Sequence, residues 1–136
     1  MNIVPDFKQK ELTQKLIKAF YTVYNTLGYG FLEKVYENAL MVELRKQSIQ
    51  ATQQQNLKVY YEKEIVGDYY ADIHADNSVI IELKTAETLK EDDKYQLINS
   101  LRATESEVGL LINFGKKPEF RRVVFSNSNK QFAEIS

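Results

Sequence analysis

Two acidic residues and one lysine lie close together in the sequence, on either side of a short turn. Asp72 precedes a turn centred on Asn77, and Glu82 and Lys84 follow it in the segment VIIELK (79–84). The surrounding β-branched and aromatic residues predict two strands joined by this turn. Because side chains two residues apart share one face of a strand, Glu82 and Lys84 point to the same side. Pairing about Asn77 would bring Asp72 opposite or diagonal to Glu82.

These residue types suit metal-dependent phosphodiester chemistry. Asp72 and Glu82 could supply the carboxylate ligands of Mg²⁺ or Mn²⁺, and the backbone carbonyl of Leu83 could supply a further oxygen. A bound divalent ion acidifies a water molecule and offsets charge on the phosphate. Lys84 could orient that water, assist its deprotonation or stabilise the developing negative charge.

A chance pattern is the alternative explanation. Glu-X-Lys is common on strands, and an exposed ion pair between Glu82 and Lys84 would contribute little to stability. However, the two charges interrupt the most apolar strand before residues 107–115. Charged residues at the end of a buried strand are costly unless they serve a function. The residues alone leave both explanations open.

The composition is ordinary for a globular protein. The 136 residues are 43% hydrophobic and 27% charged, which suits one domain over 1–136 with a core at about 8–125. The absence of cysteine removes disulfides, thiolate metal sites and cysteine nucleophiles. No window reaches the roughly 18 apolar residues of a membrane span, and the first residues lack the pattern of a signal peptide. We therefore expect a cytoplasmic protein without membrane contact.

The charge argues against a protein that holds nucleic acid mainly by bulk electrostatics. The formal net charge is -1 and the isoelectric point is near 5.9. A nuclease remains compatible with this balance, because its acidic metal site lowers the total. Residues 115–130 carry a local excess of positive charge, from Lys116, Lys117, Arg121, Arg122 and Lys130. This stretch is either a solvated face or a rim that contacts phosphates.

Apolar residues at helical spacing predict three helices, over residues 8–27, 31–47 and 90–103. Glu33 and Glu37 lie one turn apart on the second helix, where like charges cost a few tenths of a kcal/mol unless a cation neutralises them. They are either solvated surface glutamates or part of a site, and the sequence leaves this undecided. The buried stripe of the second helix is expected to comprise Leu32, Val35, Tyr36, Ala39, Leu40 and Leu44.

The remaining segments predict an α/β fold with five strands, at 54–62, 67–75, 78–84, 107–115 and 120–125. The first three are expected to be antiparallel, with turns near Lys63–Gly67 and Asp76–Ser78. The fourth is apolar throughout, which is typical of a central strand buried on both faces. The fifth is expected near an edge, and the polar tail 126–136 is expected to fray.

Other residues that could do chemistry have ordinary explanations. His74 is the only histidine and follows Asp72 on the same predicted strand face, but we expect it to face solvent or lie near the turn, and we assign it no role. Four tyrosines on the first two strands could stack on nucleic-acid bases. Strand packing explains them better. They are Tyr60, Tyr61, Tyr69 and Tyr70.

Asp72 followed by Glu82-Leu83-Lys84 resembles the PD-(D/E)XK nuclease superfamily, and the chain is similar to a small PD-(D/E)XK-like family named for a GxxExxxR signature. The resemblance implies a restriction-endonuclease-like core, in which a mixed β-sheet is flanked by helices. The matching segments are LGYGFLEKVYENAL (27–40), YYADIHADNSVIIELKTAETL (69–89), YQLINSLRAT (95–104) and EVGLLINFG (107–115).

The resemblance also implies further site residues. Glu33 matches an acidic residue that joins the metal site from the first core helix, and Gln96 matches the glutamine of a Q-xxx-Y pattern on the helix after the Glu-X-Lys strand. Two positions depart from the family. Glu37 stands in place of the arginine of the signature, and Ser100 stands in place of the tyrosine of Q-xxx-Y. These departures bear on substrate positioning more than on metal binding.

Three hypotheses follow. The first is a Mg²⁺- or Mn²⁺-dependent nuclease acting on DNA, with a role in repair or defence. The second is a non-catalytic module that binds nucleic acid or protein and keeps the nuclease fold, which the acidic isoelectric point and the two departures favour. The third is a homo-oligomeric scaffold whose tyrosine-rich strands pair with another chain. The intact set of Asp72, Glu82 and Lys84 favours the first.

Overall fold

The computed structural model of the protein describes residues 9–130. Its elements along the chain are α1 (Lys10–Leu27), α2 (Glu33–Lys46), β1 (Ala51–Tyr61), β2 (Glu64–Ala75), β3 (Val79–Lys84), α3 (Glu91–Arg102), β4 (Val108–Phe114), β5 (Pro118–Val124) and a 3₁₀ turn, η2 (Asn127–Asn129). All predicted helices and strands exist within these residues, with ends that differ from the prediction by at most three positions. The start of the first helix at residue 8 and the tail beyond residue 130 lie outside the described residues.

The five strands form one mixed sheet in the order β1-β2-β3-β4-β5. Neighbouring strands are antiparallel except β3 and β4, which are parallel. A parallel pair needs a crossover connection, and α3 provides it. The predicted α/β architecture is confirmed, as are the antiparallel first three strands and the edge position of the last strand.

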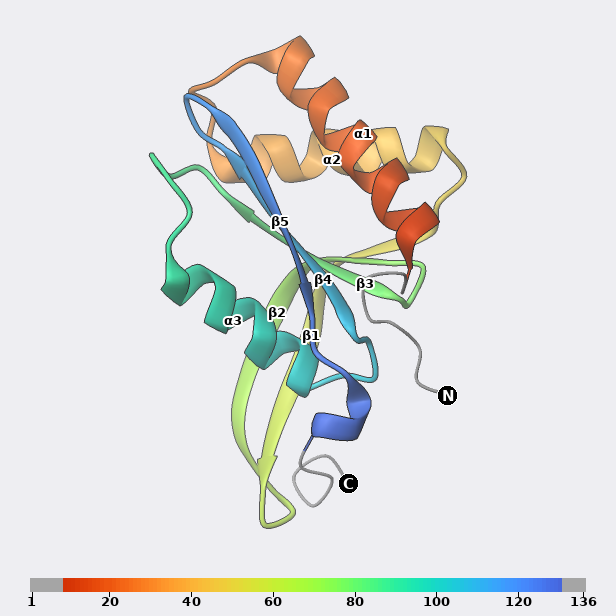
Figure 1. Ribbon diagram of the computed structural model, residues 1–136, viewed down its shortest axis with the longest axis vertical. Helices are drawn as coiled ribbons and strands as arrows, with labels where there is room; N and C mark the ends of the chain where they lie inside the picture. The colour runs from red at the N-terminus through yellow and green to blue at the C-terminus, as the bar shows by residue number, and fades with distance from the viewer. Residues whose placement is uncertain (1–8, 131–136) are drawn as a thin grey trace.

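Helices cover both faces of the sheet, so that the fold has three layers (Figure 1). Helices α1 and α2 pack on one face, over a core that includes Val79, Ile81 and Leu83 of β3. Helix α3 packs on the other face, where Ile80 belongs to a second core. The predicted alternation along β3 is confirmed, and it directs Glu82 to the α3 side. All seven residues of β4 are buried, as expected for a central strand.

The turn between β1 and β2 is shorter than predicted. Only Glu62 and Lys63 lie outside the strands, and both have positive φ angles (49° and 72°). This geometry is typical of a two-residue hairpin turn. Gly67, which the sequence analysis placed in the turn, lies inside β2 opposite Val59. A side chain there would approach the Val59 Cβ to 3.3 Å, so glycine permits close strand approach rather than a turn. The resulting long hairpin extends from one end of the molecule (Figure 1).

The buried stripe of α2 is narrower than predicted. Tyr36, Leu40 and Leu44 are buried, but Leu32 is 79% exposed and Val35 is 39% exposed. Leu32 precedes the first helical residue, so the helical periodicity does not direct it toward the core. The polar residue Glu37 is buried instead.

The basic stretch 115–130 does not form one continuous charged rim. Lys130 is buried, and its Nζ donates to the carbonyl oxygens of Thr104 at 2.8 Å and Ser106 at 2.9 Å. Arg121 pairs with Glu91 of α3 at 3.6 Å. The described part of the tail is therefore attached to the α3–β4 connection, whereas fraying was predicted. None of the described helices is both long enough and apolar enough to cross a membrane.

Candidate active site

The sheet opens at Asp72. The ladder between β2 and β3 consists of Ala75–Val79, His74–Ile80 and Ile73–Ile81, which confirms pairing about Asn77. The next pair in this register would be Asp72 and Glu82, but no backbone pairing continues there. Instead, the Leu83 N–H donates to Asp72 Oδ2 at 2.8 Å. The Asp72 carboxylate thus replaces a backbone acceptor and holds the two strands together at the point where they separate.

Glu82 lies beside Asp72 in a partly buried position. Burial raises the pKa of Glu82 most, and the charge of Asp72 and a hydrogen bond with it raise it further, to about 8. Lys84 acts in the opposite direction. Two carboxyl groups this close cannot both ionise at little cost. The metal-free protein therefore holds a proton on Glu82 at neutral pH.

Lys84 points toward the N-terminal half of α3. Its Nζ lies 3.5 Å from Gln96 Oε1 and 3.8 Å from Asp93 Oδ1. Asp93 also accepts a hydrogen bond from the Lys90 N–H at 3.0 Å and so caps the helix. The Gln96 amide and the Asp93 carboxylate orient the Lys84 side chain, which is 31% exposed. Gln96 was expected near the site from the family resemblance, whereas Asp93 was not expected there.

Glu33 joins the same charged cluster from α2. Partial burial raises its pKa most, followed by the charge of Asp72, while Lys84 lowers it. The loop before α2 fixes this position: the Tyr36 hydroxyl donates to the Gly28 carbonyl oxygen at 2.5 Å and accepts from the Phe31 N–H at 3.2 Å. The structure thus brings residues of α2, β2, β3 and α3 into one region, namely Glu33, Asp72, Glu82, Lys84 and Gln96.

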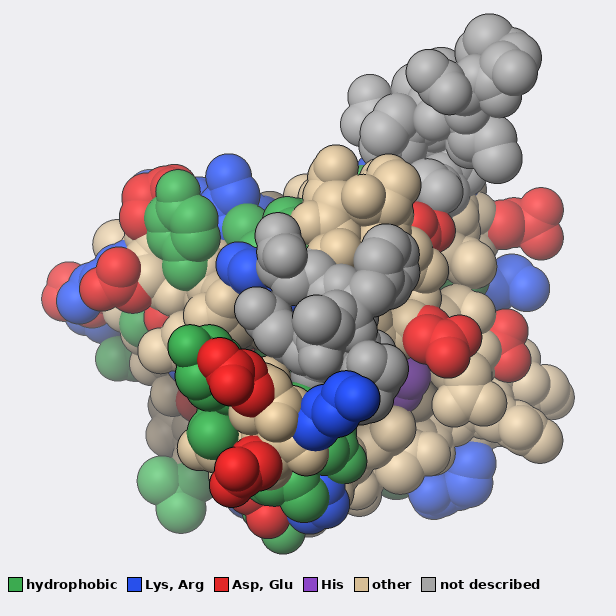
Figure 2. Space-filling model, turned by 90° about the horizontal axis from the view of Figure 1, so that it is seen from below, with side chains coloured by type: hydrophobic (Ala, Val, Ile, Leu, Met, Phe, Trp, Pro, Cys, Tyr) green, Lys and Arg blue, Asp and Glu red, His purple; other side chains and the backbone are tan. Residues whose placement is uncertain are grey.

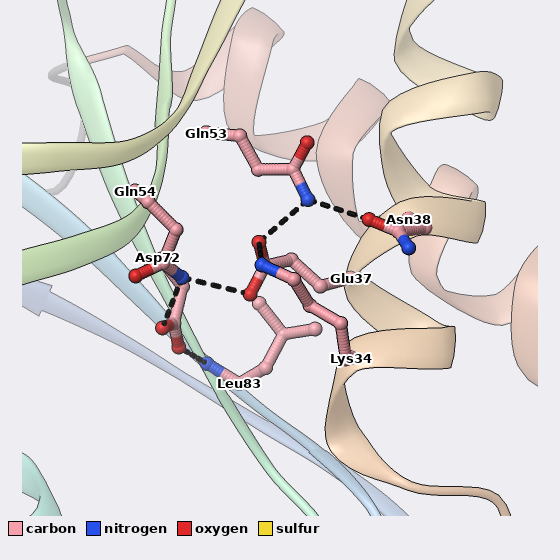
Figure 3. A network of polar contacts seen from close by, with 7 residues as sticks. All are labelled: Lys34, Glu37, Asn38, Gln53, Gln54, Asp72 and Leu83. Atoms are coloured by element: carbon pink, nitrogen blue, oxygen red, sulfur yellow. Dashed lines mark hydrogen bonds and ion pairs between the residues drawn. The ribbon is translucent and has the colours of Figure 1, made fainter.

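Glu37 is the centre of a network behind Asp72 (Figure 3). It is 4% exposed and accepts from Lys34 Nζ at 3.0 Å, Gln53 Nε2 at 2.6 Å and Gln54 Nε2 at 2.9 Å. Gln54 Nε2 also lies 3.3 Å from Asp72 Oδ1. Of the two explanations left open for the Glu33 and Glu37 pair, a solvated surface position is wrong for Glu37. Glu37 anchors the Gln54 amide, which contacts Asp72.

Gln53 and Gln54 were not expected near the site. Three consecutive glutamines, 53–55, form a polar run in the first strand. A polar run in a strand that packs on a core indicates that its side chains have polar partners. Gln54 has a positive φ angle of 53° and no ladder partner, which lets its side chain reach both Glu37 and Asp72. This local conformation is not visible in the sequence.

His74 lies outside this cluster. It is 7% exposed, so the solvent-facing alternative is wrong and the position near the turn is correct. Its Nδ1 lies 2.6 Å from Gln55 Oε1 and its Nε2 lies 2.7 Å from Ser106 Oγ. Burial lowers its pKa and so favours the neutral ring. These contacts connect the hairpin to the α3–β4 connection.

The tyrosines divide into two groups. Tyr69 is partly buried and packs against the α3-side core, as strand packing predicts. Tyr61 and Tyr70 are 60% and 56% exposed, so strand packing does not explain them. Ser100 is buried and donates to the Gln96 carbonyl oxygen at 3.3 Å.

The donor groups fit a hard divalent cation. Asp72, Glu82 and Glu33 offer carboxylate oxygens. Burial is the main cause of the raised pKa values of both glutamates, and the charge of Asp72 adds to it; a positive ion would offset this second contribution. Within residues 9–130, no three acidic or histidine side chains already stand in ligand geometry. Binding would therefore require side-chain rotation and loss of the Glu82 proton.

This combination of a mixed sheet between helices and a carboxylate pair beside a lysine is that of a restriction-endonuclease-like fold. Residues 10–123 match the PD-(D/E)XK nuclease superfamily. The chain belongs to this superfamily. No curated protein matches the sequence.

A solved structure shares the fold. The crystal structure of SSO0001 superimposes with a TM-score of 0.54 at 18% sequence identity, covering 87% of this chain and 60% of the other. The chain thus spans about three fifths of the length of that protein. At this identity the similarity concerns the fold alone.

Proposed function

We propose that the protein is a metal-dependent nuclease that hydrolyses phosphodiester bonds in DNA. The observation that carries the proposal is the opening of the sheet at Asp72, with Glu82 beside it and Lys84 directed by Gln96. A clustered acid pair costs stability in the free protein. Membership of the PD-(D/E)XK superfamily supports the same chemistry.

Each side chain has a distinct role in the proposal. Asp72 and Glu82 would hold Mg²⁺ or Mn²⁺, with Glu33 and the Leu83 carbonyl oxygen as further ligands. The ion supplies an acidified water and charge compensation at the phosphate. Lys84, held by Gln96, orients the nucleophilic water or stabilises the developing negative charge. Asp72 keeps its position because Leu83 and Gln54 donate to it.

Two finer assignments belong to this proposal. We assign the chain to the GxxExxxR-type group within the superfamily, with Glu37 as a departure from that signature. We also expect that residues 1–136 form a single nuclease-like domain, and that the protein is cytoplasmic and acts in DNA repair or defence.

Replacement of Lys84 tests the mechanism. Lys84→Ala should abolish Mg²⁺-dependent cleavage of a panel of single-stranded, double-stranded and branched DNA, because the lysine is needed only in the reaction. Its side chain makes one amide contact and one long ion pair, so the melting temperature should change little. Lys46→Ala is a matched control, since Lys46 is 67% exposed at the far end of α2. Cleavage by Lys84→Ala at the wild-type rate would disprove the mechanism.

A non-catalytic binding module is the second candidate. The net charge of -1 and the departures at Glu37 and Ser100 favour it. Calorimetric titration separates the two functions, because a binding module has no need of a divalent ion. No Mg²⁺ or Mn²⁺ binding by the wild type, or unchanged binding by Asp72→Ala, would favour the module.

A further inference from the structure

A cavity of about 640 Å³ lies between the β1–β2 hairpin and α3, and Glu82 is part of its wall. This volume is within the range of roughly 300–1,000 Å³ that is usual for small-ligand sites. Gln96 also lines it, so the cavity is continuous with the candidate active site. It is too small for a duplex and large enough for one nucleotide.

The hairpin side of the cavity is aromatic. Tyr60, Tyr69 and Tyr70 line it, together with Val59. The register shift between Val59 and Tyr60 leaves Val66 as an extra residue of β2. Near this irregularity, consecutive residues of both strands border the cavity, Val59 with Tyr60 and Tyr69 with Tyr70. Tyr70 is 56% exposed although most of its ring is apolar. An exposed aromatic face beside a cavity can stack on a nucleobase.

The Tyr69 hydroxyl does not face this cavity. Its oxygen is buried beside the Ser100 hydroxyl, which donates to the Gln96 carbonyl oxygen at 3.3 Å. The contribution of Tyr69 to the cavity is therefore its ring.

The α3 side of the cavity is polar. Gln96, Asn99 and Ser100 occupy one face of the helix, at spacings of three and four residues. Amide and hydroxyl groups both donate and accept hydrogen bonds, as the edges of nucleobases require. Lys58 and Arg102 add positive charge to the same lining. The cavity, whose wall includes Glu82, therefore combines stacking surfaces, base-edge partners and two cationic side chains, of which Lys58 pairs with Asp68 at 3.4 Å.

We propose that this cavity binds an unpaired base of single-stranded DNA and thereby presents the adjoining phosphodiester to Glu82. The proposal deepens the function proposed above and rests on it for the reaction. Bases within a duplex are stacked and paired, so they cannot offer their faces to Tyr70. Among the described residues on the face seen in Figure 2, acidic and basic side chains are interspersed. With a net charge of -1, stacking must contribute a large share of the affinity.

Equilibrium binding without divalent metal tests the proposal. The probe is a fluorescein-labelled 12-nucleotide oligothymidylate, measured by anisotropy in EDTA at fixed salt, against a labelled hairpin duplex and a strand of the same length with abasic sites. The wild type should bind the oligothymidylate at least about tenfold more tightly than either competitor, as the loss of one stacked base predicts.

Two exposed tyrosines of the same hairpin provide a matched comparison. Tyr70→Ala should weaken oligothymidylate binding about tenfold, whereas Tyr61→Ala should stay within about twofold, because Tyr61 is 60% exposed but does not line the cavity. Tyr70→Phe should retain wild-type affinity, since it keeps the ring. Asn99→Ala, on the opposite wall, is a second variant that should weaken binding without altering the hairpin.

Equal affinities of Tyr70→Ala and Tyr61→Ala, duplex binding as tight as single-strand binding, or tighter binding of an oligouridylate RNA would each overturn the proposal. The test is independent of catalysis. Tyr70-dependent binding without cleavage in Mg²⁺ would refute the nuclease and leave the base cavity in place. Metal-dependent cleavage, together with unchanged DNA binding by Tyr70→Ala, would support the nuclease and refute the base cavity.

Discussion

The Asp72 carboxylate accepts a hydrogen bond from the Leu83 N–H at 2.8 Å, at the point where the backbone ladder of β2 and β3 ends. One side chain thus closes the sheet locally and contributes a negative charge to the candidate site. Two substitutions at this residue separate these contributions, because asparagine keeps a hydrogen-bond acceptor and loses the charge.

Asp72→Asn should preserve the stability of the fold and eliminate divalent-metal binding. Asp72→Ala should also eliminate metal binding, and in addition should lower the free energy of unfolding by about 1–3 kcal/mol, since the Leu83 N–H loses its acceptor. Urea unfolding and calorimetric titration measure the two effects. Wild-type metal affinity in Asp72→Asn would contradict the assignment of Asp72 as a ligand.

The raised pKa of Glu82 makes the stability of the metal-free protein depend on pH. Its folded-state pKa of about 8 lies above its usual value of 4.5, so the folded protein holds a proton that the unfolded chain releases. The stabilisation is complete below about pH 4.5 and is lost as the pH rises through about 8, on the order of a few kcal/mol in total.

Glu82→Gln should remove this dependence and make the metal-free protein more stable than the wild type at pH 8. Urea unfolding at several pH values between 5 and 8.5 measures the effect, with Glu43→Gln on the surface of α2 as a control. A wild-type stability that rose with pH across this window, after subtraction of the control, would show that Glu82 is ionised in the folded protein.

Metal binding near neutral pH should release about one proton, because Glu82 must ionise to become a ligand. The affinity for Mg²⁺ or Mn²⁺ should therefore increase with pH up to about 8 and then level off. Calorimetry at pH 7 in two buffers of different ionisation enthalpy reports the number of protons directly. Identical heats in the two buffers would mean that no carboxyl group ionises on binding.

Gln54 should affect the site more than its neighbour Gln53. Both donate to Glu37, but only Gln54 also contacts Asp72, at 3.3 Å. Residues that orient a ligand in this way typically alter metal affinity by about 10–100-fold when they are removed. Gln54→Ala should weaken metal binding by at least about tenfold, and Gln53→Ala by less than about threefold. Similar losses in both variants would indicate that Glu37 acts only through the stability of the fold.

The sequence alone determined the elements of the fold and the residues that converge in the site. Alternation along β3 separates Ile81 and Leu83 from Glu82 and Lys84, and the turn at Asn77 brings Asp72 opposite Glu82. These relations depend on the two-residue period of a strand and on a short turn, both of which are local. The resemblance to the nuclease family then added Glu33 and Gln96, which lie in the same region as Asp72, Glu82 and Lys84.

Only the tertiary structure decided how these residues are held and what surrounds them. Gln54 has a left-handed backbone and contacts Asp72 of the next strand. Glu37 is buried and accepts from Gln54. Lys84 contacts Asp93 of α3, and none of these contacts follows from the periodicity of a single element. The same is true of the cavity between the hairpin and α3, in which Tyr70 is exposed rather than packed. Periodicity assigns a side chain to a face of its own element. Which groups it contacts there depends on how the elements pack. That packing brings Leu83 and Gln54 into contact with Asp72, and it raises the pKa of Glu82 by burial.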